Sequence, residues 1–246
     1  MLDYNYYSNH IISSSISGLI EVIISQPIEY SKTIYQTNRR FNYKHIFNGI
    51  TARLIGVIPM RTVFWSSMEI SEDYLKPIIN QNKLRYLIVG SIAGFFQSFI
   101  DGPIDYIKTI YMIEKNNIKY NNNNNYVIPG FYSLLYRNMI FASLFNYQTK
   151  YLKDKITNKK YSYNQHLTNL GISFISSPLP IIITQPFDYI KTIQQIQPRK
   201  NIFQIIKETP YYKLFYCGLK ERLLVTTINM TIGYPIYQYL FHYLSN

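Results

Sequence analysis

One short pattern occurs three times in this chain and constrains its fold more than any other feature. The pattern reads Pro-x-acid-Tyr-x-Lys-Thr-Ile, and its copies begin at Pro27, Pro103 and Pro186. The copies lie 76 and 83 residues apart in a chain of 246 residues, so that each unit takes about a third of the length. One copy alone would be uninformative, but three copies at this period predict three similar structural units.

Each copy carries an acid and a lysine three positions apart, which places both side chains on one face of a helix. The pairs are Glu29 with Lys32, Asp105 with Lys108, and Asp188 with Lys191. Each proline lies inside its predicted helix, where it removes one backbone hydrogen bond and is expected to kink the helix.

A polar linker and a second apolar stretch follow each copy, and the stretch begins at Gly49, Gly130 or Gly218. Two helices are therefore expected in every repeat. Small residues four positions apart precede each proline, as in the Gly90 and Gly94 pair, and favour close contact between helix backbones. The predicted helices cover approximately 8–37, 50–76, 84–115, 130–155, 165–197 and 218–244.

Composition excludes several classes of protein. The chain is 47% hydrophobic and 15% charged, which is too apolar for a disordered chain and poor in charge for an ordinary soluble surface. No uninterrupted apolar run is long enough for a typical transmembrane helix, so a plain hydropathy reading would favour a soluble protein. The single cysteine and the scattered histidines predict no disulfide, no metal site and no cofactor. The net charge of +12 predicts an anionic partner.

The triplicated pattern resembles the signature of the mitochondrial carrier family, Pro-x-[Asp/Glu]-x-x-[Lys/Arg] on odd-numbered membrane helices. The resemblance covers nearly the whole chain. It implies an all-α membrane protein with six transmembrane helices, built as three tandem two-helix repeats with threefold pseudosymmetry around a central cavity. The repeats would cover 8–80, 84–158 and 165–246 within one carrier domain, residues 1–246.

The resemblance also implies a transporter, not an enzyme, that crosses the mitochondrial inner membrane several times. The abundance of Ile, Asn, Tyr and Lys is typical of an AT-rich genome, such as that of a giant DNA virus. In that case the membrane would belong to the host's mitochondrion.

A ring of ion pairs is expected at the matrix end, because charges inside a membrane protein face the interior and pair with one another. If the three proline-containing helices surround an axis, each acid meets the lysine of a neighbouring helix. In the family a glutamine four residues after each lysine braces the pair, and Gln36 and Gln195 match this position whereas Met112 does not. The expected pairs are Glu29–Lys108, Asp105–Lys191 and Asp188–Lys32.

The resemblance implies a second gate at the cytoplasmic end, on the even-numbered helices. Only Glu69 and Lys153 keep the family's charges there, and they are expected to pair. This gate is therefore predicted to be weaker than the matrix gate, which biases the resting state toward opening to the intermembrane space. Its residues, counted from the aligned glycines, are Glu69, Glu72, Lys150, Lys153 and Gln238.

Solute contacts in the family lie midway along the even-numbered helices. Arg137 is the only cation among the matching residues here, and Arg61 can reach the same cavity. An arginine without a partner in the motif suits an anionic solute, because a guanidinium binds carboxylate or phosphate through two hydrogen bonds. An interhelical hydrogen bond or a lipid phosphate would be the alternative partner. The candidate contact residues are Gly56, Val57, Arg61, Arg137, Asn138 and Thr226.

Two features disagree about the solute. The Arg137-Asn138 pair resembles carriers of keto and carboxylic acids, whereas the segment around Gly56 resembles the second helix of pyrimidine-nucleotide carriers. Phe64, Trp65 and Tyr147 offer stacking faces for a base. The preferred interpretation is exchange of nucleotides or deoxynucleotides by alternating access, with transport of keto or carboxylic acids as the alternative.

A soluble, basic, helical protein that binds nucleic acid is a third interpretation. It is not favoured, because the lysines and arginines form no single stripe. The expected partners are therefore an anionic solute, with a nucleotide preferred, and cardiolipin. The protein is expected to act as a monomer without nucleic acid.

Overall fold

The computed structural model describes residues 4–113, 128–157 and 165–229 of the chain, together with 232, 236, 239, 240, 243 and 244. The described residues are helical or in short connections, and they contain no strand. The helices are α1 (Tyr4–Gln36), η1 (Tyr43–His45), α2 (Ile50–Leu75), α3 (Asn82–Ile113), α4 (Phe131–Thr157), α5 (Gln165–Ser176), α6 (Pro178–Ile196), α7 (Ile202–Glu208), α8 (Tyr211–Tyr216) and α9 (Leu219–Ile228).

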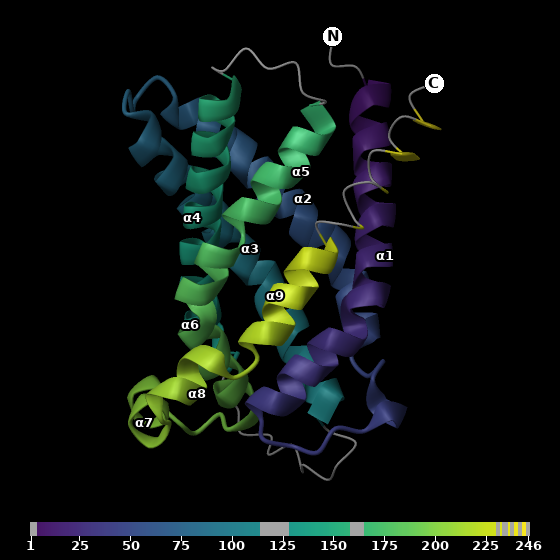
Figure 1. Cartoon of the computed structure of the whole chain (residues 1–246), viewed down its shortest axis with the longest axis vertical. Helices are drawn as coiled ribbons and strands as arrows, with labels where there is room; N and C mark the ends of the chain where they lie inside the picture. Colours follow the sequence, from purple (N-terminus) through teal and green to yellow (C-terminus); the bar gives the residue numbers. More distant parts are fainter. Residues whose placement is uncertain are drawn as a thin grey trace.

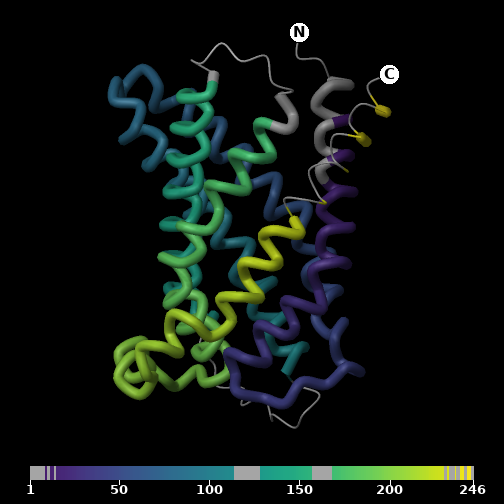
Figure 2. Tube along the Cα trace, in the orientation of Figure 1, coloured from purple at the N-terminus to yellow at the C-terminus, as the bar shows by residue number. Residues whose placement is uncertain are grey.

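The long helices run between two ends of an elongated bundle (Figure 1). At one end the first turns of α1 meet the C-terminal residues, where the Asn9 amide donates a 2.8 Å hydrogen bond to the Leu244 carbonyl. The short helices α7 and α8 lie at the opposite end (Figures 1 and 2). We call these the terminal end and the motif end, because the acids and lysines of the repeated pattern lie toward the latter.

Neighbouring helices form a closed ring of contacts. α1 packs on α2, α2 on α3, α3 on α4, α4 on α6, and α6 on α9, which packs back on α1. Such a ring is able to surround a central axis, and it brings the first and last described helices of the chain side by side (Figure 2).

The repeated prolines lie inside continuous helices: Pro27 in α1, Pro103 in α3 and Pro186 in α6. Figure 2 shows the C-terminal part of α1, which contains Pro27, slanting away from the line of its first part. This is the bend that a proline inside a helix is expected to produce.

The prediction of a single helix over 165–197 is wrong. The structure has two helices there, α5 and α6, which are separated at Ser177. Pro178 follows directly, and Pro180 comes two residues later. Because a proline has no backbone N–H and disfavours helical geometry in the residue before it, a helix ends most easily at this point.

Small residues permit close packing of α3 on α4, as predicted for the second repeat. A Cβ atom on Gly90 would lie 2.4 Å from the Ala142 carbonyl oxygen, and one on Gly94 would lie 2.4 Å from that of Asn138. In the third repeat Ser177 lies instead at the break between α5 and α6. Within the described residues, two stretches are long and apolar enough to cross a membrane, namely α3 and residues Thr168–Ile196.

Candidate functional site

Three ion pairs connect α1, α3 and α6 near the motif end. Each pairs an acid of the repeated pattern with the lysine of a different copy, and the partners are those expected from the sequence. Because every pair joins a different two of the three helices, the pairs close a triangle. They are Lys32–Asp188 at 2.9 Å, Lys108–Glu29 at 3.3 Å and Lys191–Asp105 at 2.7 Å.

Contacts within single helices extend this triangle into a continuous network. Lys108 also lies 2.8 Å from Asp105, and Lys191 lies 3.5 Å from Asp188. The side chains of Asp188 and Lys191 are almost completely buried, at 0% and 2% exposure. Buried charges at this depth are tolerable only because each one has opposite charges and hydrogen bonds around it.

Two glutamines hydrogen-bond to the acids of this network. The amide of Gln36 donates to Asp188 at 3.0 Å, and that of Gln195 donates to Asp105 at 2.9 Å. The corresponding residue on α3 is Met112, which is buried against Tyr30. The Glu29–Lys108 pair therefore lacks the amide that the other two pairs have.

The aligned glycines place α2, α4 and α9 against this network. Gly49, Gly130 and Gly218 immediately precede these helices, and their φ angles of 77°, 79° and 80° lie in the left-handed region that favours glycine. A Cβ on Gly49 would lie 2.7 Å from the Lys108 carbonyl oxygen, and one on Gly130 would lie 2.9 Å from that of Lys191. Each of these helices thus begins beside a lysine of the ion-pair triangle or, for Gly218, beside Lys32 and Gln36.

Arg137 of α4 joins the same network, so the expectation that it lacks a partner in the motif is wrong. Its guanidinium lies 2.8 Å from Asp188 and 2.9 Å from Asp101 of α3. It also donates to the side-chain oxygen of Asn138, whose amide donates in turn to Asp101 at 3.0 Å. The neighbour that the sequence analysis missed is Asp101, an acid outside the repeated motif.

Arg61 of α2 is also paired with an acid. Its guanidinium donates to the Glu21 carboxylate on α1 and, at 3.4 Å, to the Ser17 hydroxyl. The Arg61 side chain keeps 31% of its surface exposed, whereas that of Arg137 keeps 14%. Arg61 is therefore the more accessible of the two candidate cations.

Three of the predicted solute contacts pack within the helices instead of presenting polar groups. A Cβ on Gly56 would lie 2.4 Å from Ile104, so the space beside this glycine is filled by α3 and is not left for a base. Val57 lies against Gly18 of α1. The Thr226 hydroxyl donates to the Arg222 carbonyl of its own helix at 3.0 Å.

The aromatic side chains proposed for base stacking already contact one another or their neighbours. Phe64 and Trp65 meet edge to face with their ring centroids 5.2 Å apart. Tyr147 stacks on Tyr151 of the same helix at 5.8 Å.

The terminal end does not contain the expected pair between α2 and α4. Glu69 is exposed, and no ion pair of the described residues includes it. Glu72 pairs at 3.0 Å with Arg85, near the start of α3, because the connection after α2 is short enough to bring the two together. Lys150 lies over the ring of Tyr86, 5.9 Å from its centre, and Gln238 is outside the described residues.

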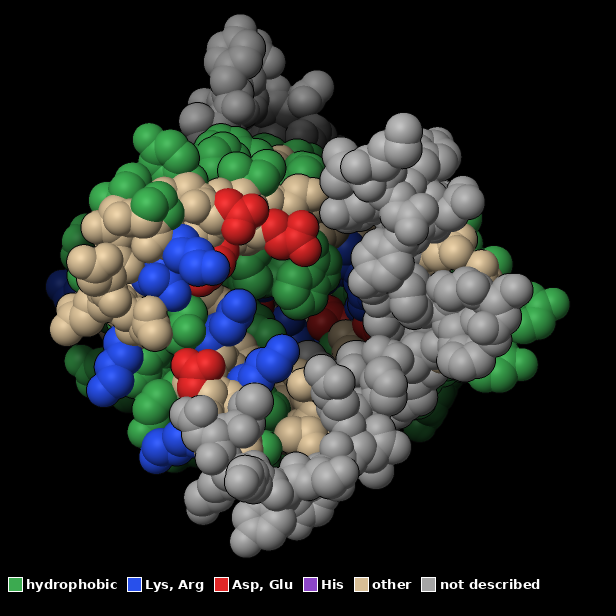
Figure 3. Space-filling view, turned by 90° about the horizontal axis from the view of Figure 1, so that it is seen from above, with side chains coloured by type: hydrophobic (Ala, Val, Ile, Leu, Met, Phe, Trp, Pro, Cys, Tyr) green, Lys and Arg blue, Asp and Glu red, His purple; other side chains and the backbone are tan. Residues whose placement is uncertain are grey.

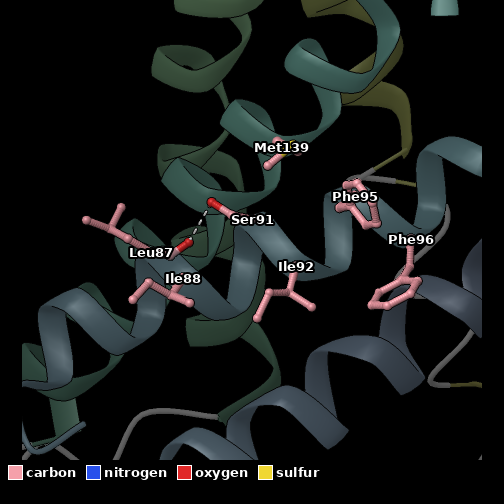
Figure 4. A pocket seen from close by; sticks show the side chains of 7 residues that line it. All are labelled: Leu87, Ile88, Ser91, Ile92, Phe95, Phe96 and Met139. Atoms are coloured by element: carbon pink, nitrogen blue, oxygen red, sulfur yellow. Dashed lines mark hydrogen bonds between the residues drawn. The ribbon is translucent and has the colours of Figure 1, made fainter. Parts of the chain in front are cut away.

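Figure 3 shows the molecule from the terminal end, which is hollowed near its centre, with basic and acidic side chains around the depression. A second recess, shown in Figure 4, is apolar and lies on the outer surface of α3 and α4. The hydroxyl of Ser91 there donates to the Leu87 carbonyl of its own helix at 3.0 Å, so the recess offers no free polar group for a charged solute. Its lining residues are Leu87, Ile88, Ser91, Ile92, Phe95, Phe96 and Met139.

Comparison with known proteins finds carriers along most of the chain, although no family model matches it. A mitochondrial glycine transporter of Vanderwaltozyma polyspora is 24% identical over 94% of this chain and 95% of its own length. A mitochondrial 2-oxodicarboxylate carrier of Mus musculus is 23% identical over 78% of this chain and 76% of its own length. A mitochondrial aspartate-glutamate transporter of Saccharomyces cerevisiae is 25% identical over 86% of this chain and 28% of its own length.

These similarities and the triplicated motif agree with each other. The relatives are named as transporters, so the chain is a solute transporter and not an enzyme, and its place is the mitochondrial inner membrane. Along most of its length, this chain is therefore similar to members of the mitochondrial carrier family.

Proposed function

We propose that this chain carries small keto or carboxylic acids across the mitochondrial inner membrane by alternating access. The observation that carries the proposal is Arg137, a guanidinium inside the bundle that is bonded directly to the ion-pair triangle through Asp188. A guanidinium binds a carboxylate through two parallel hydrogen bonds, and its charge does not titrate in proteins. The names of the relatives point the same way, since oxodicarboxylate, aspartate and glutamate are carboxylates and none of the three named above is a nucleotide carrier.

The arrangement we propose has six membrane-spanning segments in three tandem repeats around one axis. The segments are α1, α2, α3, α4, α5 with α6, and a sixth that begins with α9. The remainder predicted for the sixth, up to 244, lies mostly outside the described residues. The closed ring of helix contacts supports this arrangement. So do the glycines of positive φ, which begin α2, α4 and α9 in the same way.

The ion-pair triangle would serve as the gate at the matrix side. In the structure it is closed, while the expected Glu69–Lys153 contact at the opposite end is not made, so the solute would enter from the terminal end. In the opposite state the terminal end would close through Glu69 and Lys153. A solute drives this cycle by binding more tightly to the intermediate than to either closed state.

Arg137 would connect solute binding to the gate. A carboxylate that takes the guanidinium away from Asp188 leaves this acid with Lys32, Lys191 and Gln36 only. The network around Asp188 is then weaker, which favours opening at the motif end. Exchange would be faster than net uptake, because an empty site leaves the network intact.

Transport by purified protein in liposomes tests the proposal. We expect labelled 2-oxo acids or dicarboxylic acids to enter vesicles faster when the vesicles are preloaded with the same compound. Arg137→Ala should abolish this uptake, whereas Asp73→Asn should not, because Asp73 is an exposed acid of α2 away from the network. Uptake of nucleotides without uptake of carboxylates would overturn the proposal in favour of the nucleotide interpretation.

The remaining expectations stay predictions. Cardiolipin is expected to bind to the chain, since the chain carries a net charge of +12 and this lipid of the inner membrane is anionic. A monomer is expected because the proposed solute path lies inside one chain.

A further inference from the structure

Besides Met112, the second repeat departs from the other two at a contact between its two helices. In the first repeat Arg53 bonds to Ser25 at 3.1 Å, and in the third Arg222 bonds to Thr184 at 2.9 Å. Both hydroxyl residues stand two positions before the repeated proline, and both arginines stand four positions after the aligned glycine. These contacts fix α2 to α1 in the first repeat and α9 to α6 in the third repeat in the same manner.

In the second repeat the acid Asp101 takes the hydroxyl position and the apolar Leu134 takes the arginine position. The guanidinium instead comes from Arg137, three residues further along α4 and therefore on the same helix face. The first and third repeats thus have a hydroxyl–arginine contact, where the second repeat has a carboxylate–arginine ion pair of 2.9 Å. The arginine of this ion pair stands about one helical turn closer to the terminal end.

This ion pair restricts the chemistry of the solute. Asp101 is buried and Arg137 is mostly buried, with side-chain exposures of 10% and 14%. Arg137 is the only cation that the structure records against Asp101 among the described residues. A solute with only carboxylates that took Arg137 would leave Asp101 charged and without a cation, and breaking a buried pair in this way is costly.

Asp188, the other acid on Arg137, does not have this problem. It keeps Lys32 at 2.9 Å and Lys191 at 3.5 Å when the guanidinium turns away. Binding at Arg137 is therefore compatible with Asp188 but needs a replacement cation at Asp101. A solute that carries its own ammonium group supplies that cation.

We infer that the solute is a zwitterionic 2-amino acid, whose carboxylate binds Arg137 and whose ammonium group binds Asp101. This inference rests on the proposed function and narrows its substrate class. Asn138 lies between the two groups, donating to Asp101 and accepting from Arg137, and keeps both side chains oriented while the direct ion pair opens.

A second acid–arginine pair outside the repeated motif agrees with this inference. Glu21 and Arg61 also offer one carboxylate and one guanidinium, and Arg61 is partly exposed. Arg61 stands twelve residues after its aligned glycine, whereas Arg137 stands seven after its own, so Arg61 lies further toward the terminal end. The aligned positions in the other repeats hold no such pair, because Gln97 and Pro180 match Glu21 while Ala142 and Met230 match Arg61. A zwitterion entering from that end meets the same complementary pair of charges first at Arg61 and then at Arg137.

The test compares amino acids with 2-oxo acids of the same skeleton in liposomes that contain the purified full chain. Suitable pairs are glycine with glyoxylate, alanine with pyruvate, and glutamate with 2-oxoglutarate. We expect exchange of at least one amino acid to exceed exchange of its oxo acid by about tenfold or more, as for the loss of one hydrogen bond between charged groups. The same amino acid should also raise the unfolding temperature of the wild type in detergent by more than its oxo acid does.

Asp101→Asn sharpens the test, because it removes the charge and keeps the shape. It should lower exchange of the amino acid about tenfold or more relative to exchange of the oxo acid. Asp73→Asn is the matched control and should leave the ratio of the two rates unchanged. If Asp101→Asn does not fold, the wild-type rates and unfolding temperatures still decide the question.

Three outcomes would overturn the inference. Exchange of oxo acids without amino acids would remove the inference and leave the proposed function intact. Oxo-acid uptake that is driven by an inward proton gradient would show that Asp101 is neutralised by a proton and not by an ammonium group. Exchange of neither class would overturn both the inference and the proposed function.

Discussion

The motif end and the terminal end of the bundle satisfy their charges in different ways. At the motif end each acid of the repeated pattern contacts a lysine from another helix, and the contacts close a triangle. At the terminal end Glu69 is exposed and Glu72 pairs with Arg85 across the short connection between α2 and α3. The ion pairs of the motif end join helices that are distant in the sequence, whereas the Glu72–Arg85 pair of the terminal end joins two consecutive helices.

This difference indicates which end is able to open at low cost. Opening the motif end would separate three ion pairs, of which the two that are hydrogen-bonded to glutamines are buried and the third is partly buried. Opening the terminal end breaks no recorded ion pair between α2 and α4. The comparison therefore predicts that substitutions at the motif end have large effects, and that equivalent substitutions at the terminal end have small ones.

The largest effect is expected for Asp188→Asn. Asp188 is completely buried and lies between Lys32, Lys191 and Arg137, so removing its charge leaves these cations without their common partner. We expect a loss of about 3–5 kcal/mol in the free energy of unfolding, together with loss of transport. Thermal unfolding in detergent and exchange in liposomes measure the two effects, and a stability close to wild type would contradict the role assigned to the triangle.

A smaller loss is expected for Gly218→Ala at the motif end. Gly218 has a φ of 80°, and an added Cβ would lie 3.0 Å from the Gln36 side chain. We therefore expect the free energy of unfolding to fall by about 1–2 kcal/mol. Gly171→Ala is the matched control on α5, since no atom lies within 4 Å of its added Cβ. It should leave stability unchanged or raise it slightly because alanine favours a helix. Equal losses at the two positions would show that the start of α9 is not constrained by its contact with α1.

Met112→Gln should strengthen the weakest pair of the triangle. The Glu29–Lys108 distance of 3.3 Å is the longest of the three, and Met112 stands where the other repeats have a glutamine. An amide that reaches Glu29 should add about 1 kcal/mol to stability and slow the exchange of solute. Met112→Leu keeps the apolar contact without an amide and should produce neither change. A Met112→Gln protein that is no more stable than this control would mean that the amide does not reach the pair.

Much of the motif end could be predicted from the sequence, because three copies of one pattern constrain one another. The partners of Lys32, Lys108 and Lys191 followed from placing three similar helices around an axis, and the structure contains the same contacts. The two matching glutamines were equally predictable. Each of these predictions rests on a residue that occurs at the same place in at least two repeats.

The remainder could not be predicted, because it depends on residues that occur in one repeat only. Asp101 is the only acid at its position, and its partner Arg137 stands three residues beyond the position that the arginine has in the other two repeats. The break at Ser177 likewise reflects two prolines that the other repeats lack. The Glu72–Arg85 pair depends on how α2 and α3 are connected. Internal repetition thus predicts the shared framework, while the features that would distinguish one solute from another are visible only in three dimensions.

The smallest effect is expected for Glu69→Gln at the terminal end. Because Glu69 is exposed and has no ion pair in the described part of the chain, the change in stability should stay within about 0.5 kcal/mol. Glu72→Gln, three residues away, should lower the free energy of unfolding by about 1 kcal/mol, since it removes the 3.0 Å ion pair with the buried Arg85. The pair of variants thus separates a local contact between consecutive helices from a gate between distant ones. If Glu69→Gln were as destabilising as Asp188→Asn, the terminal end would be held closed by a charge network of its own, and the contrast between the two ends would be wrong.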